Sequence, residues 1–190
     1  MGSRLLWLVL AGLLLRAQTV PPSATNPDAE KQAALEARLA AEAQRRTTAI
    51  SDPEIFRYVK QIGARLATVM PPPSHHYEFV VIAENLNGST HEPFSLPGGT
   101  IFVPLRLLAD AQDEAEFAGM LAHAMSHVAL YEPERQNPLV QGVPLYTGIN
   151  MSLGGSYPGA VPLSLAQTMR ARERSADFLA VQVMAKAGYP

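Results

Sequence analysis

The order of the periodic segments along the chain predicts an α+β domain, with helices first, then a small sheet, then helices again. Apolar residues follow helical spacing in residues 51–70 and give way to a strand-like run at 77–84. Helical spacing returns after residue 104. With 190 residues and a hydrophobic content of 47%, the chain is long and apolar enough to bury one core.

Two helices are expected before the sheet. Residues 28–46 are rich in Ala, Glu, Gln, Lys and Arg, which are strong helix formers. The second helix is expected to begin at Ser51, because Ser51 and Glu54 form a capping box and Pro53 suits the first turn. The proline run at 71–73 ends this helix.

Two short strands are expected to form the sheet. The segment "YEFVVIAE" (77–84) is rich in β-branched and aromatic residues, which is typical of a strand. In "SLPGGTIFVP" (95–104), a Gly-Gly turn precedes a second strand at 100–103.

Helices are expected after the sheet. A short helix contains Leu107 and Leu108, Asp113 caps a longer one, and a closing helix spans about 164–187. Residues 133–163 are rich in Pro and Gly, and this composition favours a surface loop over a lid across a cleft.

The N-terminus resembles a secretory signal. A basic start at Arg4 precedes an apolar run at 5–15, which is shorter than the ~20 residues that a membrane span needs. Cleavage near Ala17 predicts a secreted or periplasmic protein with no transmembrane segment afterwards, and an uncleaved membrane anchor is the alternative. The expected organisation is a signal peptide at residues 1–17, a linker at 18–27 and one domain at 28–190.

Charge and cysteine content exclude several classes of protein. The formal net charge is −2, so the basic excess typical of nucleic-acid-binding proteins is absent. The chain has no cysteine, which excludes a disulfide framework and a thiolate zinc site.

The segment "LAHAMSHVAL" (121–130) carries a histidine pair. His123 and His127 are four residues apart, so both project from one helical face and can share a tetrahedral metal ion. Downstream, "RERSAD" places Glu173 and Asp177 four residues apart on another expected helix. Glu173 can supply a third ligand, and Asp177 can accept a ring N–H from a ligand histidine. Spacing alone equally fits a packed histidine pair and an ordinary charged helix face.

Three ordered segments together resemble the HtpX/CAAX-prenyl-protease family of zinc metallopeptidases. They are "FSLPGGTIFVPLRLL", "DEAEFAGMLAHAMSHVAL" and "ERSADFLAVQVMAKAGY". The likeness covers roughly residues 30–190 and is strongest to the soluble, periplasmic BepA-like branch and the mitochondrial Oma-type enzymes. It implies a gluzincin-type α+β fold, a bound Zn²⁺, a polypeptide substrate, and an active-site helix beside a small sheet whose edge strand binds substrate backbone.

By position, the resemblance assigns roles to individual residues. His123 and His127 match the two histidine ligands, Glu173 matches the third ligand, and Asp177 matches the acid that closes the last motif. The segment beside the substrate cleft is matched by Phe94, Pro97, Gly98 and Gly99, with Glu92 just before it.

Two departures from the family pattern bear on activity. Ala124 stands where the family has its catalytic glutamate, and alanine can neither take a proton from water nor give one to a leaving amine. Glu92 and Pro93 stand where the family has Asn-Ala, and Pro93 removes a backbone N–H that an edge strand can offer a substrate. Efficient proteolysis is therefore not expected.

Several interpretations remain open at this stage. The chain can be a slow zinc metalloendopeptidase, a pseudo-protease that serves as a peptide-binding or chaperone-like module, or a C-terminally truncated remnant, because the family continues beyond Pro190. Glu92 can replace the missing base only if it reaches the reacting water. Retention of the signal segment, together with the changes at Glu92 and Pro93, favours natural drift over an engineered origin for Ala124.

Overall fold

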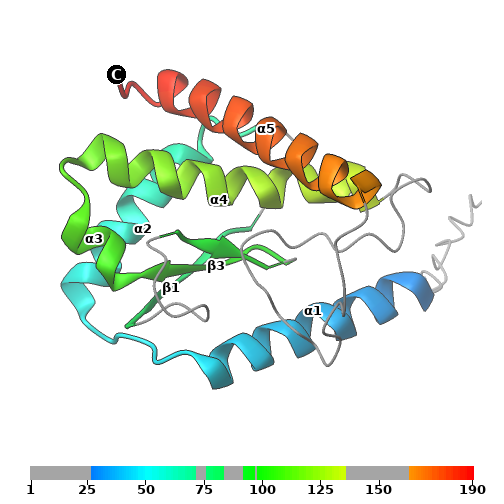
Figure 1. Cartoon of the computed structure of the whole chain (residues 1–190). Helices are drawn as coiled ribbons and strands as arrows, with labels where there is room; N and C mark the ends of the chain where they lie inside the picture. Colours follow the sequence, from blue (N-terminus) through cyan, green and yellow to red (C-terminus); the bar gives the residue numbers. More distant parts are fainter. Residues whose placement is uncertain (1–26, 72–75, 84–91, 97, 136–162) are drawn as a thin grey trace, which may run out of the picture.

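The computed structural model describes residues 27–71, 76–83, 92–96, 98–135 and 163–190 (Figure 1). Its helices are α1 (Pro27–Arg46), α2 (Pro53–Ala67), α3 (Leu105–Asp110), α4 (Glu114–Arg135) and α5 (Leu163–Lys186). Its strands are β1 (Glu78–Ile82), β2 (Phe94–Ser95) and β3 (Thr100–Pro104). The expected signal peptide, all but the last residue of the linker, and Pro97 lie outside these residues. The α+β class is confirmed.

The sheet has the strand order β1-β3-β2. β1 runs parallel to β3, whereas β2 pairs antiparallel with it, with Phe94 opposite Phe102 and Ser95 opposite Ile101. The turn between β2 and β3 closes where the Gly99 N–H donates to the Leu96 carbonyl at 3.1 Å. Gly99 has a φ of +90°, and a Cβ there would lie 1.8 Å from the His76 carbonyl oxygen, so only glycine fits this turn.

The two faces of the sheet pack against different helices. On one face, Phe94, Leu96 and Phe102 pack with Leu39 and Ala43 of α1. The opposite face is buried under α2 and α4 with the alternate strand residues, which are Phe79, Val81, Ile101 and Val103. Figure 1 shows the resulting layers: α1, the sheet, α4 and, outermost, α5.

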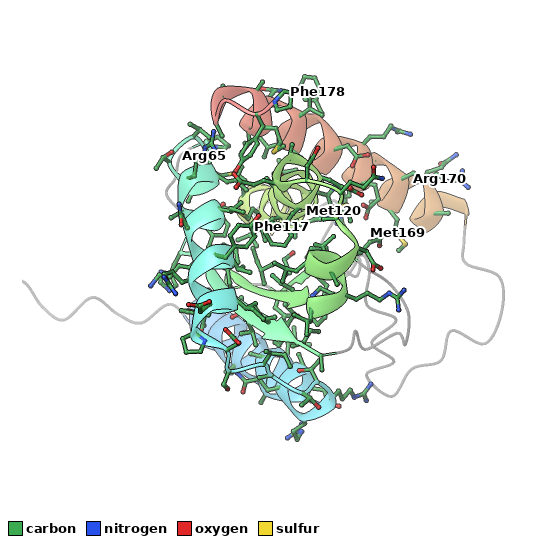
Figure 2. The ribbon with its side chains drawn as sticks, turned by 90° about the vertical axis from the view of Figure 1, so that its left-hand side faces the viewer. Arg65, Phe117, Met120, Met169, Arg170 and Phe178 are labelled. Carbon is green, nitrogen blue, oxygen red and sulfur yellow. The ribbon has the colours of Figure 1, made fainter. Side chains whose placement is uncertain are left out.

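Small side chains allow α5 to lie against α4, and this pair of helices makes the most extensive contact in the described structure. Ala118 and Ala122 of α4 are fully buried, as are Ala176 and, nearly, Ala180 of α5. Figure 2 shows Phe117 below α4, toward the sheet, and Phe178 pointing outward from α5. Close approach of two helix backbones brings their polar side chains within contact distance of one another.

A polar cluster joins the ends of three helices. The Tyr189 hydroxyl lies 2.8 Å from Oε1 of Glu114, and Nη1 of Arg65 lies 3.4 Å from the same oxygen. The Arg65 guanidinium stacks 4.2 Å from the centre of the Tyr189 ring and donates to the Ala187 carbonyl at 2.9 Å. The cluster fixes the C-terminal end of α5 against α2 and the start of α4.

Of the two helix caps that the sequence predicted, one is wrong and one is confirmed. Asp52, not Ser51, caps α2, because its Oδ1 accepts from the backbone N–H groups of Glu54 and Ile55. Proline at the first helical position makes the preceding residue the cap, which explains the shift by one residue. Asp113 does cap α4, with Oδ1 2.8 Å from the Glu116 N–H.

Two further corrections concern the short strand β2 and the C-terminal end of α4. The residue pattern did not predict β2, because a strand of only two residues has no detectable alternation, and only the family resemblance implied an edge strand near Pro93. α4 continues to Arg135, so the first three residues of the segment 133–163 are helical, while residues 136–162 lie outside the described part of the chain.

Among the residues that the structure describes, no helix combines the length and the hydropathy needed to cross a bilayer.

Candidate metal centre

Two helices supply the polar side chains that meet beside the edge strand β2. α4 carries His123 and His127 on one face, one helical turn apart. α5 carries Glu173 and Asp177 at the same spacing, and its packing against α4 turns them toward the two histidines. The structure therefore brings together all four residues that the sequence proposed.

Three atoms that could bind a metal ion converge on one point. Nε2 of His123 lies 3.1 Å from Nε2 of His127. Oε2 of Glu173 lies 3.4 Å from the first of these nitrogens and 3.5 Å from the second. The two imidazoles meet edge to face, with ring centroids 4.7 Å apart.

This spacing fits a tetrahedral zinc ion. Zinc bonded at about 2.0–2.2 Å to nitrogen and oxygen ligands places those atoms roughly 3.3–3.6 Å from one another. The two separations from Glu173, 3.4 and 3.5 Å, fall in that range, and the 3.1 Å between the two histidine nitrogens lies slightly below it. Two imidazoles and one carboxylate are also a donor set that zinc hydrolases use, with one position left for water.

Glu173 has a further feature that suits a metal ligand. Its second oxygen, Oε1, is buried and has no hydrogen-bond partner among the described residues. A buried carboxylate oxygen without a partner is costly. A cation beside the carboxylate offsets that cost, because it stabilises the negative charge on both oxygens.

Asp177 fixes the orientation of the first histidine. Its Oδ1 lies 2.9 Å from Nδ1 of His123. This contact places the ring proton on Nδ1, so Nε2 keeps its lone pair and faces Glu173 and His127. An imidazole held in this orientation presents Nε2 toward the position that a metal would occupy.

Burial keeps the second histidine neutral. Desolvation lowers the pKa of His127, and the neighbouring His123 lowers it further, whereas Glu173 and Asp177 act in the opposite direction. The net effect lowers the pKa, so the ring is deprotonated at neutral pH and can serve as a ligand.

The triad opens into a cleft of about 370 Å³. Its wall is formed by α4, α5 and the edge strand β2 with the two residues before it. The lining residues are Glu92, Pro93, Phe94, Ser95, Met120, His123, His127, Glu173 and Asp177. Gly98 and Gly99 are absent from this lining, because they form the turn beyond β2.

Sequence reasoning missed two of the cleft residues. Met120 lies one turn before His123 on α4, so its helical spacing from that ligand was a usable signal. Ser95 lines the cleft because β2 forms the edge of the sheet, and the residue pattern gave no sign of that strand, which only the family resemblance implied.

Ala124 supplies no polar atom to this cleft. It is buried, with 1% of its surface exposed, and it packs in the main hydrophobic core. Its methyl group follows His123 directly on α4, where the metallopeptidase motif carries a carboxylate. The described cleft therefore contains three side chains that could hold a metal ion, without the usual adjacent base.

Comparisons with known proteins agree with this geometry. The model of the family named "Peptidase family M48" matches residues 53–190. A beta-barrel assembly-enhancing protease of Yersinia pestis is 28% identical over 163 residues, and that of Escherichia coli is 24% identical over 156 residues. Each alignment covers 74% of this chain and 31% of the relative, so the chain spans about a third of the length of these relatives.

The family match covers the sheet, α2, both helices of the metal centre and the polar cluster at the C-terminal end of α5. α1 lies outside the matched residues, although Leu39 and Ala43 pack on the sheet. M48 proteins are zinc metallopeptidases, in keeping with the two-histidine, one-glutamate cluster. The chain belongs to peptidase family M48.

Proposed function

We propose that this M48 protein binds zinc through His123, His127 and Glu173, holds extended polypeptide in the adjoining cleft, and hydrolyses it slowly. The observation that carries the proposal is the convergence of three ligand atoms 3.1–3.5 Å apart beside a residue, Ala124, that cannot act as a base. Metal binding and catalysis thus depend on different residues, and only the second is impaired.

The metal and the protein would divide the work of hydrolysis. Zinc, when bound, polarises the substrate carbonyl and lowers the pKa of a bound water. His123 and His127 donate ring nitrogens, Glu173 donates a carboxylate oxygen, and Asp177 keeps His123 in the donating tautomer. The open cleft leaves room for the substrate chain beside the ligands.

The absence of a general base at Ala124 lowers the expected rate of peptide hydrolysis. A positioned carboxylate that moves a proton contributes typically about 10²–10⁴ in rate, or roughly 3–5 kcal/mol of barrier. Ala124 forfeits that contribution. Glu92 lies on the wall of the same cleft and is the remaining candidate for partial compensation.

The edge strand β2 is the proposed binding site for the substrate backbone. Leu96 donates to the Thr100 carbonyl at 2.8 Å, so alternation directs the Phe94 backbone groups toward β3 and those of Ser95 away from it. An extended peptide can pair with Ser95 in the manner of an added strand. Pro93 occupies the next outward position and has no N–H to offer.

The proposal extends to location and organisation. A signal at residues 1–17 supports export to the periplasm or the outside, with a membrane anchor as the alternative if the signal is retained. A linker at 18–27 and a domain at 28–190 complete the proposed organisation. From the name of the relatives, beta-barrel assembly-enhancing protease, we carry over only the action on polypeptide, because the chain spans a third of their length.

Zinc content and peptide cleavage test the proposal together. We expect one zinc per chain, weak casein cleavage, and a gain of ~10²-fold or more when Ala124→Glu restores the base. Ala124→Gln is the matched control, because it has nearly the same shape but no carboxylate. Absence of zinc from the native chain and from both variants would refute the metal site.

A pseudo-protease is the second candidate, favoured by the pairing of an open cleft with a missing base. It would bind unfolded peptide through the same edge strand and act as a peptide-binding or chaperone-like module. Saturable peptide binding with no cleavage by the native chain would support it. Robust cleavage by the native chain, equal to that of Ala124→Glu, would exclude it and indicate another base, such as Glu92.

A further inference from the structure

The metal centre and the polar cluster at the end of α5 lie at two places along the same pair of helices. We propose that the polar cluster, formed by Arg65, Glu114 and Tyr189, positions the metal centre by fixing the register of α5 along α4. In that register Glu173 meets the two histidines. This inference rests on the proposed function, since it concerns the same candidate metal site.

α4 and α5 run antiparallel, so the two sites are the two ends of one shared interface (Figure 1). Glu114 begins α4, and His123 follows about 14 Å further along the helix axis, at roughly 1.5 Å per residue. On α5 the order is reversed, with Glu173 and Asp177 first and Tyr189 just after the last turn. Any slide of α5 along α4 therefore displaces both sites together.

Small side chains line the interface between the two sites. They are Ala118 and Ala122 of α4 and Ala176 and Ala180 of α5, all of them buried. Large side chains fix the register of two helices when they interdigitate, whereas alanines present only shallow ridges. Met184 places its methyl carbon 3.9 Å from where a Cβ at Gly119 would stand, but methionine is flexible and adapts to more than one register. Apolar packing alone therefore specifies the register weakly.

The polar cluster supplies the directional contact that this packing lacks. The Tyr189 ring is buried, and its hydroxyl lies 2.8 Å from Oε1 of Glu114. Arg65 of α2 lies 3.4 Å from the same oxygen and donates to the Ala187 carbonyl at 2.9 Å, so a third helix holds both partners (Figure 2). Hydrogen bonds weaken steeply outside a narrow range of distance and angle. A polar contact of this kind can specify the register of packed helices.

The backbone at the end of α5 directs Tyr189 toward Glu114. Gly188 has a φ of +80°, and its N–H donates to the Ala185 carbonyl at 3.2 Å. The Tyr189 N–H donates to the Met184 carbonyl at 3.0 Å. These two bonds form a Schellman motif, in which a left-handed residue ends the helix. The position of Tyr189 is therefore tied to α5 as a whole, and its contact with Glu114 holds the helix in place.

The metal centre tolerates little displacement. Oε2 of Glu173 lies 3.4 Å from Nε2 of His123 and 3.5 Å from Nε2 of His127. Ligand atoms around a tetrahedral zinc ion lie roughly 3.3–3.6 Å apart. A slide of α5 would carry the carboxylate out of this range. The fraction of chains in the observed register therefore scales the apparent metal affinity.

The zinc affinity of the full chain, measured by competition with a chromophoric chelator, tests the inference. Tyr189→Phe keeps the ring and removes the hydroxyl, whereas Glu114→Ala removes the acceptor. We expect each substitution to weaken zinc binding roughly two- to ten-fold, the factor that corresponds to one hydrogen bond. The visible spectrum of the Co²⁺-loaded chain should change as well, because it reports how the ligands are arranged around the ion.

Two control variants separate positioning from general stability. Glu114→Gln loses the same charge as Glu114→Ala but keeps an oxygen that can accept from Tyr189, so it should retain native zinc affinity. Ile62→Val shortens a buried side chain of α2 and costs about as much stability as one hydrogen bond. It should leave the zinc affinity and the Co²⁺ spectrum unchanged. Urea unfolding verifies that every variant is folded.

The outcomes distinguish this inference from the proposed function. Equal loss of zinc affinity in Ile62→Val and Tyr189→Phe would overturn the inference, because general stability would then explain both. Native zinc affinity in both Tyr189→Phe and Glu114→Ala would overturn it too and leave the proposed function intact. Failure of the native chain to bind zinc would overturn the proposed function as well.

Discussion

Asp177 of α5 and His123 of α4 are joined by a contact of 2.9 Å between Oδ1 and Nδ1. It links two helices that a long stretch of sequence separates, and it acts on the ring whose other nitrogen faces Glu173 at 3.4 Å. Orientation of a ligand and packing of two helices are thus coupled through one carboxylate.

Replacing that carboxylate should weaken zinc binding. Asp177→Ala removes the acceptor that fixes the His123 ring, and loss of such a partner typically costs about 10- to 100-fold in metal affinity. Competition with a chromophoric chelator measures the change. Ser175→Ala is the control, because Ser175 is an exposed residue of the same helix whose hydroxyl donates to the Ala171 carbonyl at 3.0 Å. Unchanged zinc affinity in Asp177→Ala would contradict the assigned role.

Restoring a backbone donor should strengthen peptide binding. Pro93→Ala returns an N–H at the outward position two residues before Ser95, and one further hydrogen bond is worth about 0.5–1.5 kcal/mol. We expect peptide affinity to rise roughly two- to ten-fold in anisotropy titrations. Pro104→Ala removes another buried proline, at the end of β3, and should have no such effect. Weaker or equal binding by Pro93→Ala would argue against β2 as the site of strand addition.

Acidification should destabilise the metal-free chain through His127. Its pKa is lowered in the folded state, first by burial and then by His123. As the pH falls below ~6.5, the unfolded chain gains a proton that the folded chain resists, so this contribution to stability is present above that pH and lost below it. Urea unfolding in EDTA between neutral and mildly acidic pH measures the slope.

His127→Gln should flatten that slope, whereas His76→Gln, at a histidine outside the metal centre, should keep it. An identical pH dependence for the native chain and His127→Gln would show that His127 does not carry the effect.

The polar cluster at the end of α5 should contribute measurably to stability. Tyr189→Phe removes the hydroxyl that lies 2.8 Å from Glu114, and we expect a loss of about 0.5–1.5 kcal/mol in the free energy of unfolding. Urea titration measures it. Tyr58→Phe removes a hydroxyl from a ring that packs on Phe117 and should change stability by less than about 0.5 kcal/mol. Equal effects of the two substitutions would show that the cluster is not a stabilising contact.

Local patterns in the sequence predicted most of the elements and both residue pairs of the candidate metal centre. The helical period gave α2, α4 and α5, and the change of period gave β1 and β3. His123 and His127 are neighbours on any regular helix, so their pairing followed from spacing alone. The same argument paired Glu173 with Asp177, because each pair lies within one helical turn.

Other features could not be predicted from the sequence, because they depend on contacts with residues far along the chain. β2 is too short to show alternation and exists through its pairing with β3. Ser95 and Met120 share a wall of the cleft only after β2 lies beside α4. The N-cap of α2 was predicted one residue too early, at Ser51 instead of Asp52. This error was small, because Pro53 occupies the first helical position and makes the residue before it the cap.

By itself, the sequence determined the α+β class, the family likeness, the histidine pair, the acidic pair and the alanine at position 124, since each is a matter of local spacing or residue identity. The tertiary structure decided whether the two pairs meet, and whether Glu92 lines the cleft that they form. Contact between Glu173 and His123 depends on small side chains that let α5 lie close to α4. No local period encodes that approach, because it arises from packing between segments that the chain keeps far apart.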